Sequence, residues 1–148
     1  GFATSSSTGD AYLVCTDSIG DTLWTRTYNH SQTDVGKAVE QTSDGGFIIA
    51  GYTLNNITFK ENVYLIKTKP NGDTIWTKMY YSAVEAEGYS VQQTTDGGYI
   101  ITGVTMAGVA GSYDLDLIKT PSRMAVIIKI ISKVINILVI KHRREHLI

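Results

Sequence analysis

The sequence of 148 residues contains a single cysteine, Cys15, so no disulfide can form within one chain. A chain without internal disulfides is compatible with any compartment, and cysteine usage therefore does not locate it. Only 18% of the residues are charged and 43% are hydrophobic, a composition too apolar for a disordered chain. No Gly-x-Ser-x-Gly, phosphate-loop or dinucleotide-binding motif occurs, so the enzyme classes that depend on these motifs have no support here.

Positive charge is scarce in most of the chain. Residues 1–120 contain 7 Lys and Arg against 13 Asp and Glu, a net charge of -6, whereas residues 121–148 have a net charge of +5. The acidic body argues against a nucleic-acid partner, which would need clustered Lys and Arg. The asymmetry suggests two segments of different origin or environment. The first residues contain no basic stretch followed by an apolar run, so no signal peptide is predicted from them.

What the sequence does contain is a repeat with a period of 52 residues. Residues 36–46 recur as residues 88–98 and are identical at seven of eleven positions. Residues 21–28 recur as residues 73–80 and are identical at five of eight. Self-similarity at such a period is typical of repeat architectures.

One repeat unit, residues 36–81, reads as four short strands joined by tight turns. The strands are predicted at residues 37–43, 47–53, 63–68 and 74–80. The Asp-Gly pair at Asp44 and Gly45 predicts a two-residue hairpin, because both central residues of such a turn can take positive φ. Pro70 to Asp73 forms the second tight turn of the unit.

The recurring positions are those that a repeat needs to fold. The glycines inside the second strand of each unit are expected to mark a bulge or a close backbone approach. Each Trp is expected to pack on the neighbouring unit, although stacking on a sugar is the alternative. The structural repeat positions are Asp44, Gly45, Gly46, Gly51, Asp96, Gly97, Gly98, Gly103, Trp24, Trp76, Gly20 and Gly72.

Four antiparallel strands repeated every 40–50 residues are typical of a β-propeller blade. The sequence therefore predicts an all-β fold of about two and a quarter blades: a partial blade in residues 1–29, a full blade in 36–81 and a partial blade in 88–120. Propellers usually close with 4 to 8 blades. We expect the chain to be a piece of a longer propeller or one subunit of a homo-oligomeric ring.

The segments Asp-Gly-Gly-Phe-Ile-Ile-Ala-Gly-Tyr-Thr (44–53) and Asn-Gly-Asp-Thr-Ile-Trp-Thr-Lys (71–78) resemble the β-propeller repeats of large secreted or cell-surface proteins of bacteria and archaea. The resemblance covers residues 1–120 and implies an extracellular, usually non-catalytic module. The turn before Trp24 is also similar to quinoprotein blades and to sialidase Asp-boxes. Lys69 stands where an Asp-box in the second copy would need an acid.

Few residues of the sequence point to chemistry. Asp44 and Asp96 could bind Ca²⁺, but one carboxylate per turn falls short of the 6–8 oxygen ligands that calcium takes. Asp114 and Asp116 alternate along one strand and could act as an acid–base pair, although no partner is visible in the other units. His142 to His146 fits the H-x-x-E-H zinc-protease pattern but lies outside the repeats. We therefore predict no catalytic residue, no metal and no cofactor.

Residues 121–148 depart from the repeat and form an apolar, basic tail. Residues 125–140 are dominated by Ile and Val, with polar residues on one narrow helical stripe, and basic residues follow. A surface helix would give peripheral membrane contact through residues 125–144, since sixteen residues are too few to span a bilayer. The alternatives are an out-of-frame translation and a helix that caps the last unit.

The function expected from these observations is a non-catalytic propeller module of a secreted or cell-surface protein that serves as a binding or spacer scaffold. Its partner would be a protein or glycan held by the loops at residues 5–9, 54–62 and 106–112, which differ between copies. The first alternative is a lectin-like ring of several short chains. The second is a fragment of a quinoprotein-type or glycosidase-type propeller enzyme.

Overall fold

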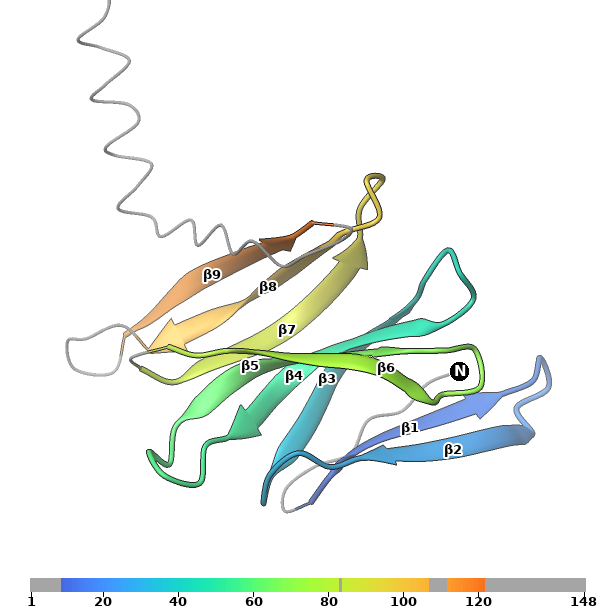
Figure 1. Cartoon of the computed structure of the whole chain (residues 1–148), viewed down its shortest axis with the longest axis horizontal. Helices are drawn as coiled ribbons and strands as arrows, with labels where there is room; N and C mark the ends of the chain where they lie inside the picture. Colours follow the sequence, from blue (N-terminus) through green and yellow to red (C-terminus); the bar gives the residue numbers. More distant parts are fainter. Residues whose placement is uncertain (1–8, 83, 107–111, 122–148) are drawn as a thin grey trace, which may run out of the picture.

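The computed structural model describes residues 9–82, 84–106 and 112–121, and within them the chain forms nine strands and no helix (Figure 1). The strands form three antiparallel sheets of two, four and three strands. The prediction of an all-β, antiparallel fold is therefore confirmed. The tail from residue 122 onward, with its predicted helix, lies outside the described residues.

Neighbours in each sheet are also neighbours in the chain. The first sheet pairs β1 (Ala11–Thr16) with β2 (Thr22–Tyr28). The second contains, in order, β3 (Asp34–Gln41), β4 (Phe47–Leu54), β5 (Glu61–Thr68) and β6 (Thr74–Tyr80). The third contains β7 (Ala86–Gln93), β8 (Tyr99–Met106) and β9 (Tyr113–Thr120). Every connection within a sheet is thus a hairpin, which agrees with the tight turns in the sequence.

The turn between β3 and β4 differs from the predicted one. Gly45 has a φ of 80°, but Phe59 is the only residue other than glycine with positive φ among those described, so Asp44 stays in the ordinary region. The backbone of Thr42 bonds to both Gly45 and Gly46, which leaves three residues in the loop rather than two. The expectation that both central residues take positive φ is wrong. The Asp44 side chain instead closes the turn by accepting hydrogen bonds from the Thr42 hydroxyl and the Gly46 N–H.

Gly51 and Gly103 lie opposite bulges in the adjacent strands of their own sheets. The register of β3 against β4 shifts between Gly36 and Ala38, so Lys37 is the extra residue of the bulge. A Cβ on Gly51 would lie 1.8 Å from the carbonyl oxygen of Val35, and backbone at that distance cannot be displaced cheaply. The glycines are therefore required by a bulge inside each sheet.

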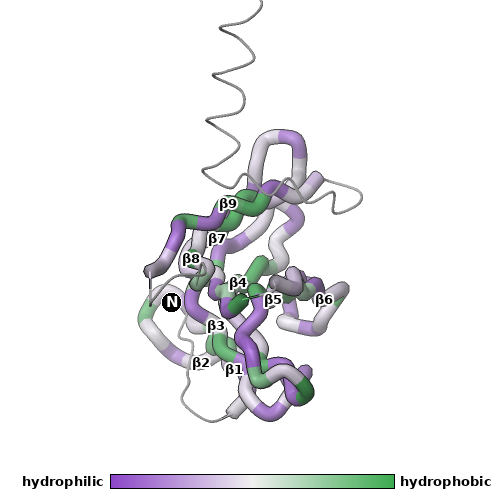
Figure 2. Tube along the Cα trace, turned by 90° about the vertical axis from the view of Figure 1, so that its left-hand side faces the viewer, coloured by the Kyte–Doolittle hydropathy of each residue, from purple (hydrophilic) through white to green (hydrophobic). Residues whose placement is uncertain are grey.

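The three sheets stack, with the second between the first and the third (Figures 1 and 2). Both faces of β4 and β5 are consequently buried, which explains their nearly continuous apolar sequences. One core cluster joins the first two sheets, and it contains Ala11, Leu13, Tyr28, Phe47, Ile49, Tyr64 and Ile66. A second joins the last two sheets, and it includes Ile48, Val63, Leu65, Tyr80, Tyr99, Ile101 and Ile118.

Candidate functional site

The two tryptophans lie at the contacts between sheets. Trp24 of β2 meets Phe47 of β4 with ring centroids 5.7 Å apart and planes inclined at 68°. Fifty-two residues later, Trp76 of β6 meets Tyr99 of β8 at 6.0 Å and 61°. Edge-to-face aromatic pairs of this kind stabilise packing beyond the area they bury. The rings thus pack on the neighbouring sheet, which is the structural role considered for them from the sequence.

Asp44 and Asp96 organise their turns through the same contacts. Asp44 accepts hydrogen bonds from the Thr42 hydroxyl at 2.6 Å, the Gly46 N–H at 3.0 Å and the Lys67 ammonium at 3.0 Å. The Thr42 bond, together with the Gly46 bond and the Lys67 charge, lowers the pKa of Asp44 to about 2. Asp96 has the same three types of partner, and its pKa is lowered most by Lys119.

These turns do not assemble a metal site. Among the described residues, no three or more His, Cys, Asp or Glu side chains are grouped so that they could hold a metal ion. The glycines that follow are packed against backbone: a Cβ on Gly46 would lie 2.0 Å from the Thr68 carbonyl oxygen, and one on Gly98 would lie 1.9 Å from that of Thr120. Asp44 and Asp96 are therefore turn residues whose carboxylates face a lysine of the adjacent strand.

Asp114 and Asp116 differ in their exposure to solvent. Asp114 is exposed, whereas Asp116 is 7% exposed and takes the place that Tyr64 has in the preceding unit. Asp116 lines a small cavity of about 40 Å³ together with Tyr80 and Ala86. The pair does not combine into one acid–base site, because only one of its carboxylates enters the interior.

A charged cluster that the sequence reading missed lies between the second and third sheets. Lys37, the extra residue of the β3 bulge, forms a salt bridge with Glu87 of β7. Its ammonium also lies 4.2 Å from the ring centroid of Tyr89 and 5.1 Å from that of Tyr52. Glu61 of β5 completes this bulge cluster through a hydrogen bond with Glu87. The sequence did contain a signal for this cluster: Lys37 and Tyr89 occupy equivalent positions in two otherwise similar repeat segments, yet they are different residue types.

The pKa values of the two carboxyl groups in the bulge cluster are shifted in opposite directions. Burial, reinforced by the hydrogen bond and negative charge of Glu87, raises the pKa of Glu61 to about 7. Burial also raises the pKa of Glu87. Hydrogen bonds from Lys37 and Glu61 have the larger, opposite effect, so the pKa of Glu87 is lowered. Burial alone would lower the pKa of Lys37, yet its bond to Glu87 raises it. Below about pH 7 the cluster is thus an ion pair of Lys37 and Glu87 with a protonated Glu61 beside it.

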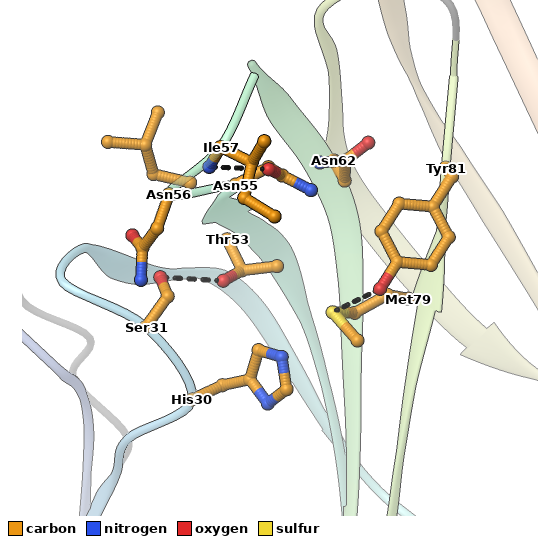
Figure 3. Close-up of a pocket in the computed structure, with 10 residues that line it drawn as sticks. His30, Ser31, Thr53, Asn55, Asn56, Ile57, Asn62, Met79 and Tyr81 are labelled. Atoms are coloured by element: carbon orange, nitrogen blue, oxygen red, sulfur yellow. Dashed lines mark hydrogen bonds between the residues drawn. The ribbon is translucent and has the colours of Figure 1, made fainter. Parts of the chain in front are cut away.

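A recess lies at the end of the second sheet, and we call it the rim pocket. It has a volume of about 170 Å³ and combines the loop before β3, the loop between β4 and β5, and the end of β6 (Figure 3). Its lining residues are mostly polar and uncharged: His30, Ser31, Thr53, Leu54, Asn55, Asn56, Ile57, Asn62, Met79 and Tyr81.

The walls of the rim pocket are held by hydrogen bonds within the chain. The buried carboxylate of Asp34 accepts bonds from the backbone N–H groups of His30 at 2.5 Å and Ser31 at 2.8 Å. The hydroxyls of Ser31 and Thr53 are 3.0 Å apart. Figure 3 shows His30 and Ser31 on one side of the pocket and Tyr81 on the other. These hydrogen bonds therefore hold the backbone of His30 and Ser31 in place beside the pocket.

The loop between β4 and β5 is shaped by Asn55. Its side-chain oxygen accepts hydrogen bonds from the backbone of Ile57 and Thr58, both at 2.9 Å. Its carbonyl accepts from Phe59, whose φ of 52° reverses the chain. This loop was predicted from the sequence as a binding segment, whereas the contributions of His30 and Tyr81 were missed because they come from other parts of the chain. Most of the two other predicted loops lies outside the described residues.

No family model matches this chain, and no curated protein matches it at a significant level. Across residues 9–82, 84–106 and 112–121, no helix has the length and apolar character needed to cross a bilayer. The H-x-x-E-H pattern and the proposed membrane-contact segment at residues 125–144 lie beyond the described part of the chain.

Proposed function

We propose that this chain is a non-catalytic binding module built from β-propeller-type blades, with the rim pocket as its binding site. The observation that carries the proposal is the rim pocket itself, a recess of about 170 Å³ formed by loops above a packed sheet. Loops on a rigid scaffold are where proteins commonly place recognition residues. The stacked antiparallel sheets and their recurring Trp–aromatic contacts support the blade assignment for the described parts of residues 1–29, 36–81 and 88–120.

The lining favours a neutral, hydroxyl-rich ligand, such as the end of a glycan. Asn56 supplies an amide donor and acceptor, whereas the side-chain oxygen of Asn55 and the amide of Asn62 bond within the chain. No Asp, Glu, Lys or Arg side chain is among the lining residues. Tyr81, 68% exposed, offers an aromatic face beside these amides. The pocket is smaller than the roughly 300–1,000 Å³ of sites for drug-sized ligands, so one sugar ring would suit it better than a long chain.

The test is a glycan array with the full chain, followed by calorimetric titration of the best ligand. Tyr81→Ala and Asn56→Ala should each weaken binding at least about 10-fold, because each removes a direct contact worth more than about 1 kcal/mol. Tyr113→Ala is the matched control, since Tyr113 is an equally exposed tyrosine on β9. Binding that is unchanged in both pocket variants, or no binding to any glycan, would refute the glycan proposal.

A lectin-like ring of several chains is the second form of this function. The same array would detect its ligand, and light scattering after gel filtration would show whether the binding species is an oligomer. A monomer that binds would favour the single-chain module. The setting we propose, secreted or at the cell surface, rests on the resemblance of the repeats and would be tested by fractionation of the source cells.

A further inference from the structure

The first and second sheets are joined by three residues of β2 that hold one turn. This turn, residues 69–73, connects β5 to β6 and is closed by its own backbone bonds. Tyr28 donates a 2.8 Å hydrogen bond to the Gly72 carbonyl, and Arg26 bonds Asp73 at 3.4 Å. The Trp24 ring lies so close that a Cβ on Gly72 would come within 2.7 Å of it. We call Trp24, Arg26 and Tyr28 the turn grip.

The turn grip recurs on β6 after 52 residues, as Trp76, Lys78 and Tyr80. Trp76 makes the same edge-to-face contact with the next sheet that Trp24 makes. Tyr80 is 7% exposed, yet its hydroxyl has no hydrogen-bond partner among the described residues. A buried hydroxyl without a partner is costly and rare, so this donor points to a missing acceptor.

Among the residues that the structure describes, no strand pairs with the outer edge of the third sheet beside this second grip. In the second sheet β5 pairs with β4 on one side and β6 on the other, whereas β9 pairs only with β8 in the described part of the chain. Tyr113 and Leu115 of β9 are 62% and 75% exposed. An unpaired strand edge is a template for adding another strand.

We propose that Trp76, Lys78 and Tyr80, together with the edge of β9, form a docking site for one kind of partner: a tight glycine turn followed by a β-strand of this same repeat type. The partner's glycine carbonyl accepts the hydrogen bond from Tyr80, and the acid after it pairs with Lys78. The glycine packs on the Trp76 ring, where a side chain would not fit. The following strand adds to β9 through its backbone, as in other cases of strand addition.

The experiment uses the full chain and a fluorescently labelled peptide of residues 69–80, which contains the turn and the strand that occupy the first grip. Anisotropy should reveal saturable binding, and amide hydrogen exchange should show new protection at residues 113–120. The peptide with Gly72→Ala should lose binding, because its methyl group would collide with Trp76. A peptide of scrambled sequence is the control for nonspecific strand addition.

Two protein variants test the assigned contacts. Tyr80→Phe should weaken peptide binding about 5-fold through the loss of one hydrogen bond, while circular dichroism verifies the fold. Lys78→Glu should weaken binding of the natural peptide and strengthen binding of a peptide with Asp73→Lys. Absence of saturable binding, equal binding of the Gly72→Ala peptide, or protection at another strand instead of β9 would overturn the proposal. The outcome is independent of any glycan at the rim pocket.

Discussion

Tyr28 donates a 2.8 Å hydrogen bond to the carbonyl of Gly72, which lies 44 residues away in the neighbouring sheet. Burial raises the pKa of Tyr28 to about 12, so the hydroxyl remains a donor at all ordinary pH values. Its counterpart, Tyr80, is equally buried but lacks a partner in the described residues. The same residue type at equivalent repeat positions is thus satisfied at one interface and unsatisfied at the other.

This difference predicts opposite effects of one substitution. Tyr28→Phe should lower the free energy of unfolding by about 1–2 kcal/mol, because it removes a bond and leaves the buried Gly72 carbonyl unpaired. Tyr80→Phe should be neutral or slightly stabilising, because it removes an unpaired hydroxyl. Urea denaturation of the two variants checks this prediction. An equal loss of stability in both would contradict it.

The strand-interior glycines predict a steric effect. A Cβ on Gly103 would lie 1.9 Å from the Glu87 carbonyl oxygen, so Gly103→Ala forces the backbone of the β7 bulge to move. We expect a loss of about 2–4 kcal/mol, or failure to fold. Gly88, which pairs with Gly103, is the matched control, since its Cβ would meet nothing closer than 3.3 Å. Chemical denaturation should therefore give a clearly larger free energy of unfolding for Gly88→Ala than for Gly103→Ala.

The Asp–Lys contacts of the turns predict a difference between the two copies. The Lys67 side chain is 5% exposed and depends on Asp44, whereas the Lys119 side chain is 31% exposed and can be hydrated. Asp44→Ala should cost about 1–2 kcal/mol, because it leaves a buried ammonium with one bond fewer. Asp96→Ala should cost less. Thermal unfolding at pH 7 measures both, and a larger loss for Asp96→Ala would exclude this explanation.

The bulge cluster predicts that stability falls as pH rises through the acidic range. The pKa of Glu61 is about 7 in the folded chain, whereas a glutamate in water has an ordinary pKa of 4.5, so between these values the folded state binds more protons than the unfolded state. Stability is therefore lost from about pH 4.5 to 7. The lowered pKa of Glu87 has the opposite effect, adding stability that is lost as pH falls below 4.5.

Glu61→Gln should remove the loss between pH 4.5 and 7 and leave the variant more stable than the parent at pH 8. After allowance for solvent screening, the gain at pH 8 should be about 1–2 kcal/mol. Denaturation at pH 5 and pH 8 gives the measurement. Glu40→Gln is the control, because the Glu40 carboxylate accepts a hydrogen bond from the Gln93 N–H instead of joining the bulge cluster. A parent protein whose stability rises across this range would argue against a protonated Glu61.

Much of the local structure could be predicted from the repeat. The strands of the central unit begin and end within three residues of the expected positions, since alternation and turn glycines are short-range signals. The β3–β4 turn was mispredicted at Asp44, because an Asp-Gly pair fits both a two-residue and a three-residue loop. Only the bonds from Thr42 to Gly45 and Gly46 distinguish the two.

The candidate site was predicted only in part, because some of its residues come from distant parts of the chain and meet only in the folded structure. The loop at residues 54–62 stood out because it differs between copies. Its partners in the rim pocket, His30 and Tyr81, reach it because β3 and β6 belong to the same sheet as β4 and β5. Lys37 and Glu87 are 50 residues apart in the chain and meet only because two sheets stack.

Local sequence was enough to predict the strands, the positions of the turns and the 52-residue repeat, because propensity, alternation and glycine conformations act over a few residues. The tertiary structure decided which carboxylates are buried, which cation faces them and which tyrosine lacks an acceptor. Those properties depend on side chains from different sheets approaching within a few ångströms. The similarity of the two repeat copies could not reveal that Tyr28 and Tyr80 have different surroundings.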